Sequence, residues 1–348
     1  MAVKAKTVIL GVVGVLILVA FGGAVAMVGF KGLGNVLFGP DARPVTDRKF
    51  PVTDARLARG KYLVEGPAHC FECHTDRDMS TPTYPIVEAK KGAGWVMPIP
   101  ELNNIASRNI TPDRETGIGD WTDDEIARAI REGVRKDGSA LFPIMPYLEF
   151  AHMDDEDVES IVVYLRTIPA VRNTVPVRNL PGPLEYIVKT IPKPLMTPVA
   201  SHPASTPAER GKYLVTLSGC AGCHTPADAQ GLPLPGLEFA GGALFKDPGQ
   251  NGKDVFTLNI TPDASGIAHY DESLFRETIR TGQIGGRMLN HIMPFGSFKN
   301  MTDGDLGDIF AHLKTLTPVK HRISNTDPPT MCPLCKQSHG LGELNAKR

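Results

Sequence analysis

Apolar residues dominate one uncharged stretch near the N-terminus. Residues 7–30 form a run of 24 mostly apolar positions, and Lys4 and Lys6 precede it. A bilayer crossing needs roughly 20 such residues, and flanking lysines favour the cytoplasmic side. We therefore expect residues 1–31 to form a transmembrane anchor. A cleaved signal peptide is the alternative, because the sequence Ala-Val-Ala at residues 24–26 is typical of a cleavage site.

Beyond residue 50, apolar residues recur at helical spacing in short stretches. A helix is expected over residues 56–65, and Thr122 with Glu125 has the pattern of a capping box. The expected helices bury these apolar positions: Ile126, Ile130 and Val134 after Thr122; Val158, Ile161, Val162 and Leu165 after Asp154; Phe275 and Ile279 after Asp271; and Leu306, Ile309, Phe310 and Leu313 after Thr302. Since no stretch predicts a large sheet, we expect an all-α fold.

After the apolar stretch, the chain is one unit repeated. The hexapeptide Arg-Gly-Lys-Tyr-Leu-Val at residues 59–64 returns unchanged at 210–215, and Asn-Ile-Thr-Pro-Asp at 109–113 returns at 259–263, where we expect turns. The stretch between the copies is rich in proline, which cannot donate to a helix or sheet, so we interpret it as a connector. The predicted units are domain 1 at residues 50–170, a connector at 171–204, domain 2 at 205–325 and a tail at 326–348.

Each repeat contains one Cys-x-x-Cys-His motif. A single Cys-x-x-Cys pair could be a disulfide, half a zinc site or a redox pair. Two copies that each end in histidine, in similar flanking sequence, indicate two covalently bound c-type haems instead. The two thiols add to the two vinyl groups of the haem, and the histidine that follows coordinates the iron. The predicted attachment residues are Cys70, Cys73, Cys220 and Cys223, and the predicted proximal ligands are His74 and His224.

A methionine is the expected second axial ligand of each iron. Met145 and Met293 each precede a proline between two predicted helices, at the same point of the repeat. Thioether ligation raises the reduction potential relative to bis-histidine ligation. Met153 and Met301 also correspond across the repeat, but they lie just before the last helix, where an apolar residue acts as a hydrophobic staple. His291 is a further competing ligand. All four methionines could also be ordinary core residues.

The tail carries a third cysteine pair that lacks the motif's histidine. Lys336 follows Cys332-Pro333-Leu334-Cys335, and His339 lies three residues further on. One interpretation is a disulfide. A second is a zinc or other metal site completed by His339. A third is a haem with lysine ligation, or one shared with a neighbouring subunit.

These segments together resemble a known family. The family features are residues 109–113, Gly117-Ile118-Gly119, Trp121-Thr122, residues 129–133 and Met145-Pro146-Tyr147. They are similar to the haem domains of cytochrome c subunits that serve membrane-bound alcohol, gluconate and sorbitol dehydrogenases. The resemblance implies two tandem class I-type cytochrome c domains, with the cysteine, histidine and methionine ligands named above. Such subunits typically carry three haem domains, whereas this chain has two.

Two functions from different classes fit these residues. The first is a membrane-anchored dihaem cytochrome c, which is not an enzyme. It would relay single electrons from a dehydrogenase or quinol-oxidising complex to a terminal oxidase or a soluble cytochrome, at the bacterial inner membrane with its haem domains facing the periplasm. The alternative is a dihaem peroxidase, which needs an iron with an open position; two equivalent Met-Pro segments argue against it. The formal charge of −1 gives no reason to expect nucleic acid as a partner.

Overall fold

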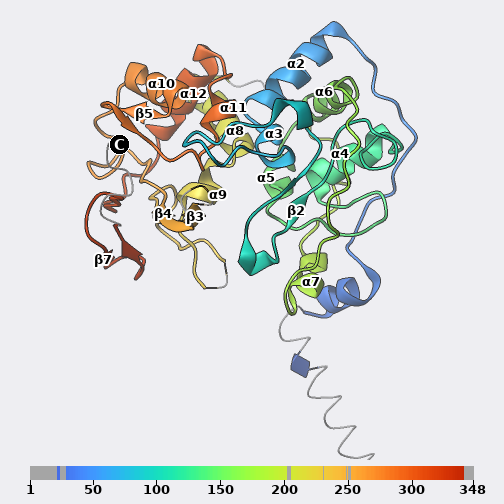
Figure 1. Cartoon of the computed structure of the whole chain (residues 1–348), viewed down its shortest axis with the longest axis horizontal. Helices are drawn as coiled ribbons and strands as arrows, with labels where there is room; N and C mark the ends of the chain where they lie inside the picture. The colour runs from blue at the N-terminus through green and yellow to red at the C-terminus, as the bar shows by residue number, and fades with distance from the viewer. Residues whose placement is uncertain are drawn as a thin grey trace, which may run out of the picture.

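The computed structural model describes residues 22–23, 29–201, 205–229, 231–247, 249 and 252–340. The two sequence repeats form two halves, which lie next to each other in Figure 1, the second at the left. The first half contains α2 (Asp54–Glu65), α3 (Cys70–His74), β1 (Trp95–Val96), β2 (Ala106–Ser107), α4 (Asp123–Glu132), α5 (Tyr147–Phe150) and α6 (Asp155–Leu165). The second half contains α8 (Pro207–Leu217), α9 (Cys220–His224), β3 (Leu244–Asp247), β4 (Lys253–Phe256), α10 (Glu272–Thr281), β5 (Gln283–Ile284), β6 (Arg287–Met288), α11 (Phe295–Phe298) and α12 (Asp303–Leu313).

One pair of packed helices forms the centre of each half. In the first half α2 packs on α6, and in the second α8 packs on α12. A Cβ built on Gly60 would lie only 1.9 Å from the backbone oxygen of Ser160, and one built on Gly211 only 1.8 Å from that of Asp308. Because only glycine permits such an approach, the shared hexapeptide sets the spacing of both helix pairs. The apolar positions expected on α4, α6, α10 and α12 are buried, except that Phe310 is only partly buried. Val134 is buried too, but it lies beyond the end of α4 rather than on the expected helix.

Polar caps begin the main helices. Thr122 and Thr206 each form a complete capping box with the glutamate three residues later, which confirms the capping box expected at Thr122. Thr302 and Asp154 cap α12 and α6 with single side-chain acceptors. The chain therefore leaves each preceding loop at a defined residue, and this fixes where the loops lie against the helices.

The two halves interlock through a reciprocal pair of hydrogen bonds. Tyr62 of α2 donates to Asp305 of α12, and Tyr213 of α8 donates to Asp157 of α6 at 2.6 Å. Each tyrosine is thus bonded to the other half. The aspartates also accept from arginines of their own halves, Arg59 for Asp157 at 2.7 Å and Arg210 for Asp305 at 3.3 Å. Because tyrosine and arginine belong to the repeated hexapeptide, both copies use the same residues to pair with one another.

The proline-rich connector packs along the first half. It contains the short α7 (Leu184–Ile187) and the 3-10 helix η3 (Val188–Thr190). Leu180 and Val188 join a small apolar cluster with Met97, Ile105 and Ala140. The shorter 3-10 helices η1 (Glu88–Lys90) and η2 (Pro100–Leu102) lie in the loops of the first half.

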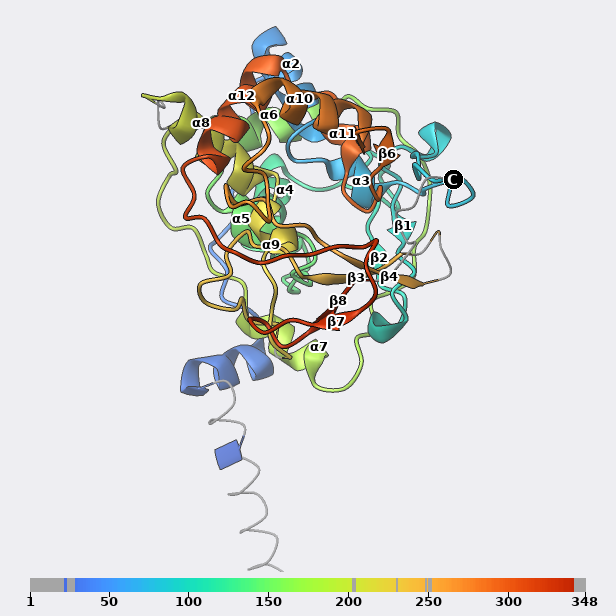
Figure 2. The same ribbon diagram turned by 90° about the vertical axis from the view of Figure 1, so that its left-hand side faces the viewer.

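The all-α expectation leaves out four antiparallel hairpins within the described residues: β1–β2, β3–β4, β5–β6 and the tail hairpin of β7 (Thr330–Met331) with β8 (Ser338–His339). Figure 2 shows the tail hairpin below β3 and β4. The turn between β5 and β6 is Gly285-Gly286, with φ of 54° and 74°. A Gly-Gly pair adopts such a turn without strain, so the sequence did contain a hairpin signal here.

The expected transmembrane helix is wrong for the part of the chain that the structure describes. No helix there has both the length and the apolar character that a bilayer crossing requires. The longest of the helices named above is α2, which has 12 residues, whereas a bilayer crossing needs roughly 20. Residues 1–21 and 24–28 of the expected anchor lie outside the described residues. The expected membrane partner and inner-membrane location depended on this helix, so the described residues do not support them.

Candidate haem sites

Both Cys-x-x-Cys-His motifs form a single helical turn. In α3 and α9 the two cysteines are three residues apart, so both thiols lie on one side of the turn and the histidine follows directly. His69 (φ 39°) and Gly219 (φ 65°) precede these turns in left-handed conformation. In each half this left-handed residue turns the chain after α2 or α8. The motif helix therefore runs in a different direction from the helix before it.

The two motif histidines are held in the same way. Nδ1 of His74 lies 2.6 Å from the carbonyl oxygen of Arg108, and Nδ1 of His224 lies 2.7 Å from that of Leu258. With Nδ1 bonded to a carbonyl, the lone pair is on Nε2, the nitrogen left for a metal. Burial lowers the pKa of both histidines, which favours the neutral imidazole that binds metals.

The repeated Asn-Ile-Thr-Pro-Asp segment explains why these carbonyls are in place. Arg108 and Leu258 directly precede Asn109 and Asn259, both of which are buried. The side-chain oxygen of Asn109 accepts from the backbone nitrogen of Thr111 at 2.9 Å, and Asn259 does the same in its own segment. These are the turns expected from the sequence. The sequence did not indicate the further role of this turn, which is to position the carbonyl oxygen that orients the motif histidine.

The motif thiols are free and do not have the character of a redox pair. None of the four is in a disulfide. Burial raises the pKa of Cys70 and of Cys220 to about 12, and that of Cys73 to about 11. Reactive redox pairs instead have lowered thiol pKa values. The free thiols and the neutral imidazoles of the two motifs therefore fit two covalently held haems, whose iron His74 and His224 would ligate.

The predicted axial methionines lie in matching positions. Met145 packs against the same core as Cys70, and Met293 against the same core as Cys220. The carbonyl of each methionine accepts from the residue two positions on, at 2.8 Å and 2.7 Å, so the loop turns sharply at the Met-Pro pair. This geometry brings methionine and motif to the same core in both halves.

The rival ligands differ in their surroundings. Met153 and Met301 are 1% and 2% exposed and directly precede the N-caps of α6 and α12, where a hydrophobic staple is expected. His291 is buried against Phe295, with ring centroids 5.3 Å apart. Its Nε2 atom has no hydrogen-bond partner.

The first motif contacts the second half across the junction between the halves. The α11 helix, which follows Met293, contacts α3, and the Ser297 hydroxyl donates to Glu72 inside the first motif at 3.1 Å. His69, directly before that motif, packs its ring on Phe298 at 5.4 Å. In the opposite direction, α5 contacts α8. Glu72, which lies between the two cysteines of the first motif, thus contacts the second half. The sequence did not predict this contact, because Ser297 is 225 positions away.

The two halves share one motif turn, one carbonyl-held histidine and one Met-Pro loop, which are the features expected of c-type cytochromes. The chain is similar to proteins of that class. The chain is 27% identical to the cytochrome c subunit of a quinone-type alcohol dehydrogenase of Gluconobacter oxydans, over 82% of this chain and 60% of that one. It is 29% identical to the fructose dehydrogenase cytochrome subunit of Gluconobacter japonicus, over 84% and 59%.

A diheme c-type cytochrome of Cereibacter sphaeroides is 27% identical over 72% of this chain and 83% of its own length. The resemblance to cytochrome c subunits of dehydrogenases is therefore confirmed. The chain spans about 60% of the length of the dehydrogenase subunits that it matches. No protein-family model matches it.

Proposed function

We propose that this protein is a dihaem c-type cytochrome that transfers electrons and is not itself an enzyme. It accepts single electrons from a dehydrogenase or a quinol-oxidising complex and passes them to a terminal oxidase or a soluble cytochrome. The observation that carries the proposal is the duplication of one complete arrangement. Both halves have a motif turn, an Nδ1-bonded histidine and a Met-Pro loop on one core.

Each half holds one haem c in this proposal. The thiols of Cys70 and Cys73 would attach the first, and His74 and Met145 would ligate its iron. The corresponding residues of the second half are Cys220, Cys223, His224 and Met293. When bound, the haem iron supplies a one-electron couple, and a thioether ligand favours its reduced form. The domains follow the sequence boundaries, residues 50–170 and 205–325.

The protein's contribution is to keep both iron ligands fixed during oxidation and reduction. The carbonyl oxygens of Arg108 and Leu258 prevent rotation of the two imidazoles. The asparagine turns in turn fix those carbonyls, and the α2–α6 and α8–α12 pairs form a rigid support. A site that is held in this way needs little rearrangement when the charge on the iron changes.

The junction between the halves favours electron passage from one haem to the other. The α11 helix beside the second Met-Pro loop contacts α3 of the first motif. The Ser297 hydroxyl of α11 also donates to Glu72, between the two cysteines of the first motif, at 3.1 Å. The reciprocal Tyr–Asp bonds hold this approach constant.

The test is the visible spectrum of the ferric protein, with haem counted by pyridine haemochrome. We expect two haems per chain and the weak sulfur-to-iron charge-transfer band of methionine ligation. Met145→Ala and Met293→Ala should each remove about half of the band, and the double variant all of it. Met196→Ala is the matched control, since this methionine is 71% exposed in the connector.

Two outcomes would contradict the proposal. A band that survives in the double variant would assign the ligands elsewhere, with Met153, Met301 and His291 as the residues to replace next. A high-spin ferric spectrum of the wild-type protein that changes on addition of peroxide would instead support a peroxidase, because such an enzyme needs an open coordination position.

A further inference from the structure

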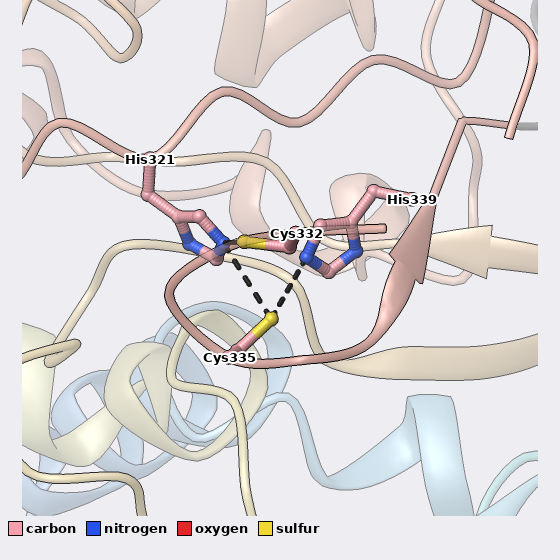
Figure 3. A group of neighbouring side chains, drawn as sticks. All are labelled: His321, Cys332, Cys335 and His339. Atoms are coloured by element: carbon pink, nitrogen blue, oxygen red, sulfur yellow. Dashed lines mark hydrogen bonds between the residues drawn. The ribbon is translucent and has the colours of Figure 1, made fainter. Parts of the chain in front are cut away.

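Four side chains that the haem sites do not use converge in the tail. His321, Cys332, Cys335 and His339 are all buried, and their ligand atoms lie within 4.8 Å of one another. Figure 3 shows that the two imidazoles and the two sulfurs face a common centre. We propose that this cluster binds one structural Zn²⁺ ion. The tail expectation of a metal site completed by His339 is extended here by a fourth ligand, His321.

The distances fit tetrahedral zinc. Sγ of Cys332 lies 2.9 Å from Nε2 of His321, and Sγ of Cys335 lies 3.0 Å from Nε2 of His339 and 3.6 Å from that of His321. In a tetrahedral site with Zn–S near 2.3 Å and Zn–N near 2.0 Å, neighbouring ligand atoms are about 3.3–3.8 Å apart. The two shorter sulfur–nitrogen contacts must therefore lengthen by about 0.5–0.6 Å to admit the ion, whereas the 3.6 Å contact already has a suitable length.

The chemistry of the ligand set selects zinc. Two thiolates and two neutral imidazoles form one of the common structural zinc sets, and tetrahedral S₂N₂ geometry is typical of that ion. Two thiolates also neutralise the charge of a divalent cation, so the buried site has no net charge to stabilise. Four protein ligands leave no open position, which is the mark of a structural site rather than a catalytic one.

His321 has a counterpart in the first repeat. It occupies the position of Asn173, since the backbone nitrogens of both donate to the equivalent hydroxyls, of Ser265 and Thr116, at 3.0 Å. The Asn173 side chain donates to the carbonyl of Ala93 at 2.9 Å, and Nδ1 of His321 lies 3.1 Å from the equivalent carbonyl of Ala240. Histidine therefore keeps the contact of asparagine and adds a second nitrogen, which faces the cysteines.

The tail hairpin and its turn hold the other three ligands, Cys332, Cys335 and His339, close together. The backbone nitrogen of Cys332 donates to Gln337 at 2.8 Å, and that of Lys336 donates to Cys332 at 3.0 Å. Lys336 is left-handed, with φ of 60°. It reverses the chain directly after Cys335, so that His339, which pairs with Thr330 in the hairpin, returns to the cysteines.

The tail has a small apolar core, in which Cys332 and Cys335 pack with Leu237 and Ala240. Met331 and Leu334, beside the two cysteines, are 68% and 50% exposed. Small structures with so little core commonly depend on a metal ion for stability. The loop under the site also reaches the second haem motif, because the nitrogen of Gly241 donates to the carbonyl of His224 at 2.7 Å. Zinc would thus tie the tail to the half that contains α9.

The test is elemental analysis of the holoprotein purified from zinc-containing medium, with iron counted in the same sample. We expect about one zinc per chain, with two sulfur and two nitrogen neighbours by X-ray absorption at the zinc edge. His321→Asn is the matched variant, because the first repeat shows that asparagine keeps the carbonyl contact. After dialysis against a chelator, it should retain at least about tenfold less zinc than wild type. Cys335→Ser should behave alike.

Three results would overturn the proposal. One is a Cys332–Cys335 disulfide, seen as a chain mass lower by two hydrogen atoms, without zinc. Another is a zinc-free chain with both tail thiols open to a thiol reagent. The third is a His321→Asn variant that keeps zinc as well as wild type. A wrong haem count would leave zinc unaffected, so the two proposals fail independently.

Discussion

Replacing Gly60 with alanine tests the central packing of the first half. An added Cβ would lie 1.9 Å from the Ser160 oxygen, 2.6 Å from its carbonyl carbon and 2.7 Å from Cβ of Tyr164. Ordinary contacts begin near 3.4 Å. Since the closest atoms belong to the backbone of α6, no side-chain rotation can relieve the clash. The two helices must separate by about 1.5 Å where they cross.

The cost follows from the contacts that this separation opens. Leu63, Val64, Ile161 and Val162 are at most 1% exposed on these two helices. A gap of this size removes much of their dispersion attraction, and overpacking costs about 3 kcal/mol at its upper range. Alanine regains about 1 kcal/mol of helix propensity. We therefore expect the free energy of unfolding to fall by about 2 kcal/mol.

Guanidinium unfolding of the ferric protein, followed by far-UV circular dichroism, measures this loss. Gly211→Ala should show a similar loss in the second half, because its Cβ would lie 1.8 Å from the Asp308 oxygen. Gly304→Ala in α12 is the control, since its nearest neighbour would be 3.9 Å away. That variant should be unchanged or more stable by up to about 1 kcal/mol. A Gly60→Ala protein as stable as wild type would refute the packing argument.

Three further changes have defined outcomes. Tyr213→Phe removes the 2.6 Å bond to Asp157 and should lower the free energy of unfolding by about 1 kcal/mol; no change would remove this bond as a tie between the halves. Thr122→Ala breaks a capping box and should cost about 1 kcal/mol by the same measurement, whereas Thr122→Ser should restore stability. Burial opposes ionisation of Glu65, but hydrogen bonds led by that of Lys61 outweigh it and lower its pKa from 4.5 to about 2. Its stabilisation is complete above the unfolded pKa and lost as the pH falls towards 2, so Glu65→Gln should flatten the acid limb of stability against pH; parallel curves for both proteins would contradict this.

Local patterns were sufficient for the helices and for the class of protein. The capping box at Thr122 and the apolar spacing of α4, α6, α10 and α12 depend on residues three or four positions apart, so they can be read from the chain. The membrane helix was wrong for the described residues, where no helix combines the necessary length and apolar character. The short hairpins were missed, although Gly285-Gly286 marked one of them.

The haem residues remain a prediction from spacing, but the structure adds what holds them. That Arg108 and Leu258 would orient the motif histidines could not be read from sequence, since each lies 34 residues from its histidine. Which repeat residues bond across the halves was likewise hidden. Tyr62 and Asp305 are 243 positions apart, and their pairing depends on how two helix pairs dock.

The tail shows the division most clearly. The sequence by itself determined that Cys332, Cys335 and His339 lie close together, because a few residues of chain cannot separate them far. The sequence indicated no role for His321, since it lies 11 positions before Cys332 and no short motif links the two residues. Only the tertiary structure decided that Nε2 of His321 lies beside Cys332. The buried Asn259 holds the chain there, because its side-chain amide donates to the carbonyl oxygen of His321 at 3.3 Å. Ligands that are close in sequence can be predicted from their spacing along the chain. The fourth ligand, His321, comes from a more distant segment, so only the folded structure shows that it belongs to the cluster.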